Sequence, residues 1–285
     1  MVAVQLSGGL GNQMFEYALY LKLKSMGKKV KIDDFTCYGP SERQRSNQLG
    51  VFGVSYDRLS QREYEALTDS CMLPWHRARR LLFGRKDRSY READCNFDPE
   101  LLRREQALLL GYFQTEKYFA DIREQVREAF TFRNLTLSGT SGEYLRQIES
   151  CRAVSVHVRR GDYLKLENQK IFGGICDETY YERALQFVRS KYEDAVFFFF
   201  SNDPEWVKAR YGGPGCVVAE GNGEDGGCRD LFLMSRCRHH ILANSSFSWW
   251  GAWLDSRLDK TVIAPKRWFN DRDCRDIYTE QMTVL

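Results

Sequence analysis

The chain has 285 residues, of which 43% are hydrophobic and 14% aromatic, enough apolar material for one large core or two modest ones. Charged residues nearly balance and leave a formal charge of +3, so composition gives no reason to expect a nucleic-acid binder. The start of the chain lacks a basic and apolar leader, and the most apolar run, residues 195–200, is too short to span a bilayer. A cytoplasmic, two-domain globular protein without an integral membrane segment is predicted.

Nine cysteines are scattered without a Cys-x-x-Cys pair, so neither a zinc ribbon nor a disulfide framework is predicted. Asp271 and Asp273 resemble a metal-binding Asp-x-Asp motif, but they lie in a polar tail and do not follow an apolar strand. We interpret them as surface residues, and the sequence predicts no metal site and no resident cofactor.

The opening of the chain has the pattern of a βαβ unit. Residues 2–6 are predicted to form a strand, a glycine-rich loop follows, and an apolar-faced helix runs to about residue 26 before a second strand at 30–32. The loop is neither a Walker A motif nor a full dinucleotide fingerprint. Its glycines, Gly9 and Gly11 among them, favour close approach of the backbone to a ligand or to a facing domain.

Residues 34–110 are irregular, with helices suggested near 61–67 and 98–105. Seven Lys or Arg residues lie between Arg77 and Arg91. A solvated basic face is the favoured interpretation, because charge runs usually have that role. Peripheral contact with an anionic membrane surface or with a lipid-phosphate acceptor is the alternative.

A second α/β half begins near residue 151. Strands are predicted at 153–159, 195–200 and 240–243, and helices at 179–191 and 230–238. Alternation of strand and helix predicts a parallel sheet. The Ser-Gly-Thr-Ser-Gly segment at 138–142 is the predicted junction. The predicted domains are therefore 1–140 and 141–285.

The first of the new strands carries two side chains suited to an anion. Valines alternate along it, so Ser155, His157 and Arg159 share the opposite pleat face. The strand runs into Arg160 and Asp162 at its carboxyl end, where open α/β sheets bind ligands. An imidazole beside guanidinium groups suits a diphosphate. A surface ion pair between Arg160 and Asp162 is the structural alternative.

Two further strand ends carry polar residues. Asn244, Ser245 and Ser246 form a turn before an aromatic helix, and the amides of a helix start are suited to an anion, although capping alone explains one of the three. The aromatic residues of that helix have core spacing. After strand 195–200, Asp203 either caps a helix or accepts hydrogen bonds from guanine or ribose.

These motifs resemble those of the α1,2-fucosyltransferases of glycosyltransferase family 11. The matching blocks are GGLGNQMFEYA at 8–18, HVRRGDY at 157–163, FFFFSNDPEWVK at 197–208, DLFLMSRCRHHILANSSFSWWGAWL at 230–254 and PKRWF at 265–269. Residues 34–110 lack a resemblance and are expected to hold much of the acceptor site.

The resemblance implies a GT-B architecture, in which two Rossmann-like domains face one another across a cleft. Domain 1–140 is expected on the acceptor side, and domain 141–285 is expected to bind GDP-fucose. The implied reaction is inverting, metal-independent transfer of L-fucose to the 2-hydroxyl of a terminal β-galactoside. The expected partners are GDP-fucose and a galactose-terminated glycan.

The resemblance also implies roles for individual residues. Arg159 is expected to hold the β-phosphate and His157 to position the nucleotide, and Asp203 to read guanine or ribose. The family usually has Ser-Asp-Asp where this chain has Ser201-Asn202-Asp203, so the first aspartate of that pattern is an asparagine here. The other expected donor contacts are Arg160, Ser201, Asn244, Ser245, Ser246 and Phe247, with Gly9, Gly11, Asn12 and Gln13 of the opening loop.

Several alternatives stay open at this point. The carboxylates of Glu16, Asp33 and Asp162 are all candidates for the group that accepts the acceptor's proton, and Asp162 is grouped with the catalytic residues. A fucosyltransferase of another linkage and a sulfotransferase are rival enzymes. A non-catalytic sugar- or nucleotide-binding module is the third rival, with the clustered tryptophans of 249–253 as a stacking platform.

Overall fold

The computed structural model describes residues 1–37, 46–137, 139–220 and 226–285, and the side chains at 162 and 164 fall outside its described part. The chain forms two compact units, Met1–Thr131 and Phe132–Leu285. Each unit has a parallel sheet of its own. The α/β class and the pair of Rossmann-like units predicted from the sequence are therefore confirmed.

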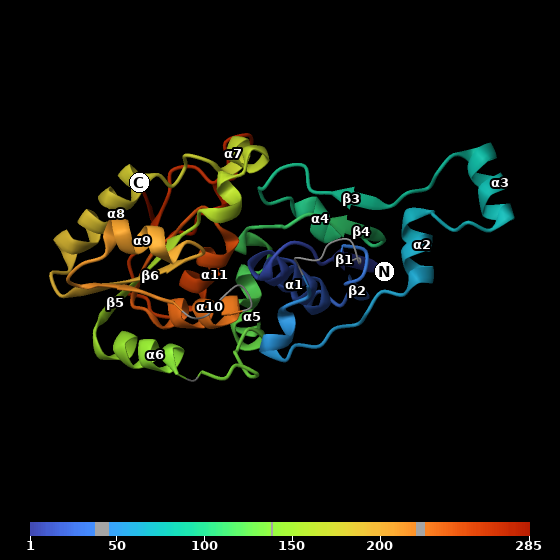
Figure 1. Ribbon diagram of the computed structural model, residues 1–285. Helices are drawn as coiled ribbons and strands as arrows, with labels where there is room; N and C mark the ends of the chain where they lie inside the picture. The colour runs from blue at the N-terminus through green and yellow to red at the C-terminus, as the bar shows by residue number, and fades with distance from the viewer. Residues whose placement is uncertain (38–45, 138, 221–225) are drawn as a thin grey trace. The chain divides into compact units, whose positions relative to one another are not determined.

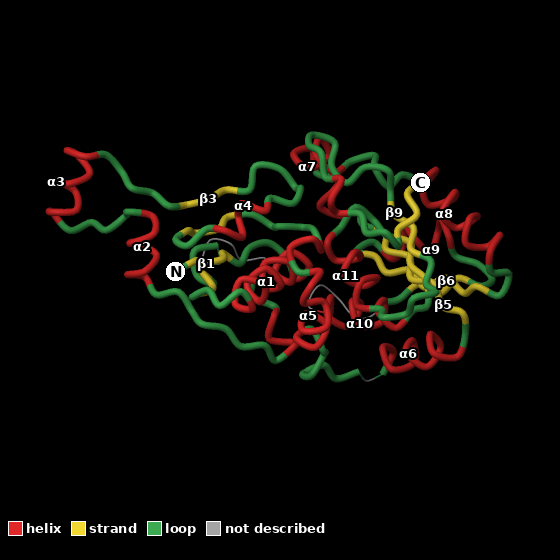
Figure 2. Tube along the Cα trace, turned by 180° about the vertical axis from the view of Figure 1, so that it is seen from behind, coloured by secondary structure: helices red, strands yellow, loops and turns green. Residues whose placement is uncertain are grey.

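The first unit contains a sheet in the order β2-β1-β4-β3. Its elements are β1 (Val2–Gln5), α1 (Leu10–Ser25), β2 (Val30–Asp33), α2 (Gln61–Thr68), α3 (Pro74–Phe83), β3 (Ser89–Arg91), α4 (Pro99–Arg103), β4 (Ala107–Leu110) and α5 (Arg123–Ala129). The predicted βαβ opening is present. Helix α2 packs on this sheet, where Leu67 joins Ala3 and Leu108 in one apolar cluster. Helix α3 lies away from the sheet at the end of long loops, as Figures 1 and 2 both show.

The second unit is larger and holds six strands. Its elements are α6 (Thr140–Ser150), β5 (Arg152–Val158), α7 (Leu166–Phe172), α8 (Glu178–Lys191), β6 (Ala195–Ser201), α9 (Pro204–Tyr211), β7 (Cys216–Val218), α10 (Gly227–Arg236), β8 (His239–Ile241), α11 (Ser246–Leu254), β9 (Val262–Ala264) and β10 (Met282–Val284). Of the predicted junction, Ser138 lies outside the described residues, and α6 begins at Thr140.

Helices cover both faces of this six-stranded sheet, on opposite sides of β5 and β6 in Figure 1. Val154 and Val156 of β5 pack against α8. On the other face, Phe198 and Phe200 of β6 pack against α6 and α10. Burial on both faces explains why β6 is an uninterrupted apolar run.

Helix α11 lies in the core of the second unit. Trp249 and Trp250 are fully buried, and Trp253 is nearly so. The Trp249 indole donates a hydrogen bond to the carbonyl of Ile277 at 2.7 Å. Because these rings are packed inside the protein, the core interpretation of the aromatic spacing is confirmed. They offer no surface for stacking a sugar.

Gly251 gives a direct test of this packing. A Cβ at Gly251 would lie 2.7 Å from Cε and 3.0 Å from Cβ of Met234 in α10. We expect Gly251→Val to lower the free energy of unfolding by about 1–3 kcal/mol, because it overfills the contact. Gly251→Ala should stay within about 1 kcal/mol of the parent, since better helix propensity offsets a smaller clash. Urea unfolding measures both, and an unchanged valine variant would contradict the packing.

Candidate functional site

The sheet of the second unit has a switch point between β5 and β8. Its strand order is β10-β9-β8-β5-β6-β7, so the chain builds outward from β5 in one direction and then returns to build from β8 in the other. Connections on the two sides leave opposite faces, and the loops diverge at the carboxyl ends of these two strands. Open α/β sheets bind ligands at such a point.

The motifs chosen from the sequence meet at this switch point. Val156 of β5 pairs with Ile241 of β8, so the loop that starts at Arg159 emerges beside the turn that contains Ser245. The Tyr163 hydroxyl donates to the carbonyl of Asn244 at 2.9 Å. The two loops that the sequence assigned to one anion are therefore side by side.

His157 is the buried centre of this region. Its side chain is 5% exposed, and its ring lies 5.5 Å from the ring of Phe247. Burial, assisted by the charge of Arg159, lowers the pKa of His157 to about 3, so the imidazole is neutral near neutral pH. Its Nδ1 atom has no hydrogen-bond partner within the described part of the chain. A buried, unpartnered ring nitrogen is ready to contact a ligand.

Arg159 lies at the carboxyl end of β5, beside His157. It follows the last residue of β5 and is half-buried. Its guanidinium lies 5.7 Å from the ring centroid of Tyr163. Because a guanidinium stays charged where the neighbouring imidazole is neutral, Arg159 supplies the positive charge at this strand end.

The start of α11 faces the same strand end. Ser245 is the N-cap, and its hydroxyl oxygen accepts from the amide of Phe247 at 3.3 Å. Ser246 is the first helical residue, so its amide belongs to the electropositive end of the helix. Asn244 is buried, and its side-chain amide donates to the carbonyls of Phe172 and Trp268 at 3.4 and 3.2 Å. Asn244 thus positions the turn, whereas the sequence grouped it with the donor contacts.

The loop after β6 lies next to the end of β5. Arg160 pairs with Asp203 at 3.1 Å, and its guanidinium stacks 3.8 Å from the centroid of the Trp206 ring. Asp203 also caps α9 through the amide of Trp206 at 3.3 Å, as the sequence predicted. Ser201 accepts from the amide of Asp203 at 3.0 Å. Arg160 thus has Asp203 as an ion-pair partner, and the side chain of Asp162, its partner in the sequence alternative, lies outside the described residues.

The opening loop of the first unit is ordered by its own polar side chains. Gly9 is the N-cap residue of α1, and Gly11 lies in its first turn. The buried Gln13 amide donates to the carbonyls of Gly8 and Ser46, at 3.0 and 2.9 Å, and its carbonyl accepts from the amide of Gln48 at 2.8 Å. Asn12 accepts from Gln114 at 2.9 Å. Gln13 therefore holds the backbone of the loop in place, and Asn12 links the start of α1 to Gln114.

Two of the three candidate proton acceptors have structural partners. Glu16 is buried, which raises its pKa well above the usual value, and it accepts from the amide and hydroxyl of Ser7 at 2.8 and 2.7 Å. Asp33 is buried and accepts from the amides of Phe35 and Thr36. Asp162 follows Gly161 in the loop after β5, and its side chain lies outside the described residues.

Asp271 and Asp273 lie in the tail that follows Trp268. Both are exposed at least in part, and they pair with Arg272 and Arg275 at 2.8 Å each. The pair with Arg272 lowers the pKa of Asp271. Their carboxylates are therefore engaged with neighbouring arginines on the surface.

Residues that the sequence did not single out fix the strand ends. The Tyr180 hydroxyl donates to the carbonyl of Leu242 at 2.6 Å, and the Tyr181 hydroxyl donates to that of His157 at 2.9 Å. Adjacent residues of α8 thus hold the ends of β5 and β8. No local pattern signals this role, because the partners are distant in sequence and the segment reads only as a helix.

A serine, a histidine and an aspartate form a chain beneath the switch point. The Ser155 hydroxyl lies 2.8 Å from His240 Nδ1, and His240 Nε2 lies 3.1 Å from Asp255. All three side chains are buried, so a substrate does not reach them. We interpret the chain as a structural link between β5, β8 and the end of α11, and not as a hydrolase triad.

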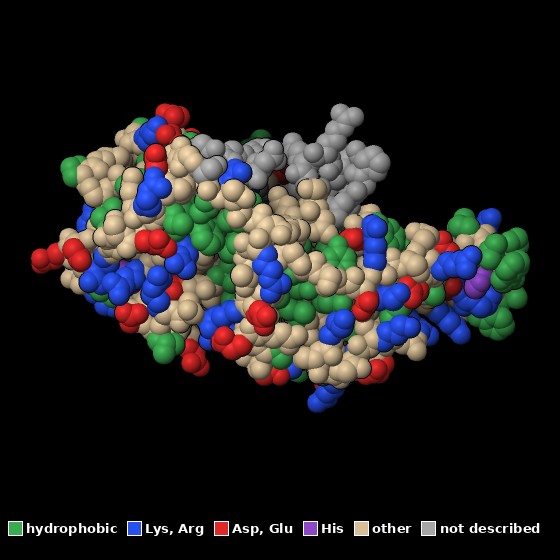
Figure 3. Space-filling model, turned by 90° about the horizontal axis from the view of Figure 1, so that it is seen from below, with side chains coloured by type: hydrophobic (Ala, Val, Ile, Leu, Met, Phe, Trp, Pro, Cys, Tyr) green, Lys and Arg blue, Asp and Glu red, His purple; other side chains and the backbone are tan. Residues whose placement is uncertain are grey.

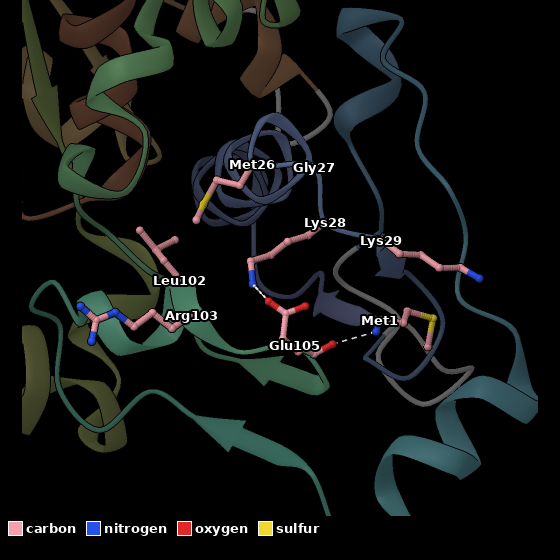
Figure 4. A pocket seen from close by; sticks show the side chains of 8 residues that line it. All are labelled: Met1, Met26, Gly27, Lys28, Lys29, Leu102, Arg103 and Glu105. Atoms are coloured by element: carbon pink, nitrogen blue, oxygen red, sulfur yellow. Dashed lines mark hydrogen bonds and ion pairs between the residues drawn. The ribbon is translucent and has the colours of Figure 1, made fainter.

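A large open hollow lies elsewhere in the first unit. It measures about 540 Å³ and is lined by Met1, Met26, Gly27, Lys28, Lys29, Leu102, Arg103 and Glu105. Figure 4 shows the Lys28 ammonium paired with Glu105 at its centre, at 2.6 Å. The hollow adjoins the amino ends of β1, β2 and β4, opposite the edge where parallel sheets bind ligands. We therefore place the site at the switch point.

Comparisons with known proteins agree with the motifs. Residues 104–283 match the family model described as Glycosyl transferase family 11. The chain is similar to an alpha-1,2-colitosyltransferase of Escherichia coli, with 31% identity over 94% of this chain and 92% of that protein. It is also similar to the galactoside alpha-(1,2)-fucosyltransferase 1 of Mus musculus, with 29% identity over 87% of this chain and 61% of that protein.

Solved glycosyltransferases are similar in structure at low sequence identity. Fucosyltransferase NodZ from Bradyrhizobium gives a TM-score of 0.43 and 14% identity, over 88% of this chain and 92% of that chain. The E. coli ADP-heptose lps heptosyltransferase II gives a TM-score of 0.47 and 14% identity, over 100% of this chain and 89% of that chain.

Acidification is expected to destabilise the protein through His157. Its pKa is about 3 when folded, against about 6.5 for an exposed imidazole, so unfolding takes up a proton between these values. Stability therefore rises with pH, by up to about 1.4 kcal/mol per pH unit from this one group. Urea unfolding at several values between about pH 7 and pH 5 should show a shallower slope for His157→Gln. Equal slopes would contradict the buried neutral imidazole.

Proposed function

Because the chain belongs to glycosyltransferase family 11, we propose that it transfers L-fucose from GDP-fucose to the 2-hydroxyl of a terminal β-galactoside, with inversion at the anomeric carbon. The observation that carries the proposal is the meeting of Arg159, His157 and the start of α11 at one topological switch point. A nucleoside diphosphate is the ligand that such a group of donors suits.

Stabilisation of the leaving group is the main task assigned to the site. As the bond from fucose to the diphosphate breaks, negative charge gathers on the β-phosphate. The guanidinium of Arg159 offers a fixed positive charge, and the first amides of α11 offer oriented donors. Both are in place before the reaction, so little reorganisation is needed. The proposed reaction requires no metal ion.

His157 has a different task in this proposal. A neutral imidazole offers one hydrogen-bond donor or acceptor at Nδ1, with the tautomer set by the ligand. In the free enzyme Nδ1 lacks a partner among the described residues, and a phosphate oxygen placed there would accept a hydrogen bond from its N–H. A bound diphosphate would also raise the pKa of His157, because negative charge favours the imidazolium.

The nucleoside is assigned to the loop after β6. Arg160 holds Asp203 through its ion pair, and the Trp206 ring lies under the Arg160 guanidinium. Asp203 Oδ2 accepts from Arg160 and Oδ1 accepts from the amide of Trp206, and the remaining lone pairs of the two oxygens can accept from guanine or ribose. The role of Asp203 in recognising the nucleoside is part of the proposal.

The attacking hydroxyl must lose its proton as the new bond forms. Glu16 and Asp33 are occupied by backbone and hydroxyl donors. Asp162 is two residues beyond Arg160 in the loop at the switch point. We therefore retain Asp162 as the candidate proton acceptor.

Colitose is the second candidate donor sugar, because a similar protein from E. coli is an alpha-1,2-colitosyltransferase. Colitose lacks one hydroxyl of fucose. A site built to bind that hydroxyl would reject GDP-colitose by orders of magnitude, whereas an apolar pocket would accept both. The ratio of kcat/KM for the two donors decides between the two assignments.

Arginines at the two ends of β5 give a matched mutational test. Arg159→Ala is expected to lower kcat by about 100-fold or more, because it removes charge stabilisation from the leaving group. Arg152 lies at the other end of the same strand, where it pairs with Asp194 at 2.8 Å. Arg152→Ala should keep kcat within about twofold. Near-normal turnover by Arg159→Ala, with its fold intact by circular dichroism, would show that Arg159 is misassigned.

Turnover itself is tested by release of GDP from GDP-fucose with lactose and EDTA present. We expect GDP release that depends on the acceptor, and a product whose new linkage NMR assigns to the 2-hydroxyl of galactose. A different linkage would replace the acceptor assignment alone. Failure with lactose and with a panel of galactosides, by a protein that still binds GDP, would leave fucosyl transfer unsupported.

A further inference from the structure

Helix α3 of the first unit exposes large apolar side chains. None of its residues is buried. Leu81 is 88% exposed, Leu82 and Phe83 are each 75% exposed, and Trp75 is 65% exposed. Figure 3 shows hydrophobic side chains gathered with Lys and Arg at the end of the surface that α3 forms, on the right of the view. Soluble proteins rarely leave such a patch without a partner.

The attachment of α3 turns this apolar face outward. Arg80 donates to the carbonyls of Asp69 and Cys71 at 3.0 and 2.8 Å, and Arg79 pairs with the Asp69 carboxylate. Trp75 and Leu82 are seven residues apart and lie on the side of the helix opposite Arg80. Arg80 therefore holds the helix on the side opposite Trp75 and Leu82, while Arg79, four residues after Trp75, reaches the Asp69 carboxylate from a neighbouring side.

The same segment is strongly cationic. Residues 70–86 contain no Asp or Glu, and they hold Arg77, Arg79, Arg80, Arg85 and Lys86. The flanking Asp69 and Asp87 pair with Arg79, Arg80 and Arg85, which leaves an excess of positive charge that includes Arg77 and Lys86. A solvated basic face, which the sequence favoured, explains these cations but not the exposed Trp75, Leu81 and Leu82. A helix with apolar side chains on one side and cations around it has the pattern of an interfacial membrane helix.

The charge of this segment favours an anionic lipid surface over a second copy of the chain as its binding partner. Two copies of α3 packed face to face would bring two cationic segments together, which is unfavourable. Anionic phospholipids complement the cations, and the headgroup boundary accepts a convex apolar face. No helix within the described ranges is both long and apolar enough to cross a bilayer.

We propose that α3 and its flanking loops, residues 70–86, bind the surface of an anionic phospholipid bilayer. Trp75, Leu81 and Leu82 enter the headgroup boundary, and Arg77 and Lys86 contact lipid phosphates. This inference goes beyond the proposed transfer reaction, and it does not depend on the identity of the donor or acceptor.

Co-sedimentation of the full chain with vesicles tests the proposal. We expect binding to vesicles of phosphatidylcholine with phosphatidylglycerol, and much weaker binding to phosphatidylcholine alone. Half-molar salt should weaken the binding, because it screens the cations. Trp75 emission should shift to the blue on binding, and Trp75→Phe should remove most of that shift, since Trp249, Trp250, Trp253 and Trp268 are already buried.

Two variants separate the apolar and cationic contributions. Leu81→Ser with Leu82→Ser should weaken binding to the anionic vesicles at least about tenfold. Arg77→Gln with Lys86→Gln should weaken it about 25-fold, at about fivefold per cation. The matched control is Leu166→Ser with Leu258→Ser, which removes two equally exposed leucines from the second unit and should not change binding.

Three outcomes would overturn the proposal. The chain fails to sediment with anionic vesicles, or it binds neutral vesicles equally well, or the Leu81→Ser/Leu82→Ser variant binds like the parent. Sedimentation velocity without lipid measures whether the chain forms a dimer through this surface. A dimer that the same leucine variant dissociates would assign the surface to a second copy of the chain instead. Thermal unfolding of each variant should match the parent, because α3 buries no residue.

Discussion

The parallel pairing of β5 with β8 is the constraint on which the site depends. It sets the register Val154 with His239, Ser155 with His240 and Val156 with Ile241. Strand β8 ends at this last pair and β5 ends two residues later, at Val158, so the loop after β5 and the turn after β8 emerge side by side. A shift of register would separate the loops and move alternate side chains to the other face.

Buried polar contacts protect this register. Beneath the site, Ser155, His240 and Asp255 form a hydrogen-bonded chain across the two strands. At the strand ends, the hydroxyls of Tyr180 and Tyr181 hold the carbonyls of Leu242 and His157. A buried network with every partner in place specifies one arrangement, because any alternative leaves polar groups unpaired.

The spacing of apolar residues along the sequence predicted those helices and strands in which a single helical or strand repeat is clear. Helix α1, the strand β6 and the helix α8 follow directly from apolar spacing, and the parallel sheets follow from the alternation of strand and helix. The short strands β3, β7 and β10 have three residues each, too few for a period to show. Helix α3 was missed because its apolar residues stand among arginines in an irregular stretch.

Topology indicates where the predicted site residues gather, whereas their individual contacts could not be read from the sequence. Parallel strands bring their carboxyl ends to one edge, so Arg159 and Ser245 could be expected to converge from topology alone. The partners of individual side chains depend on segments distant in sequence. Asn244 reaches Phe172 and Trp268, and Arg160 pairs with Asp203, contacts that no local pattern encodes.

The imidazole of His157 reports most directly on whether a diphosphate binds at the switch point. The chain has four histidines, and ¹⁵N NMR with His157→Gln assigns the resonance of His157. We predict that GDP shifts the Nδ1 resonance of His157 and raises its pKa, while the resonances of His239 and His240 change little. GDP that binds without altering His157 would place the nucleotide elsewhere and contradict the account.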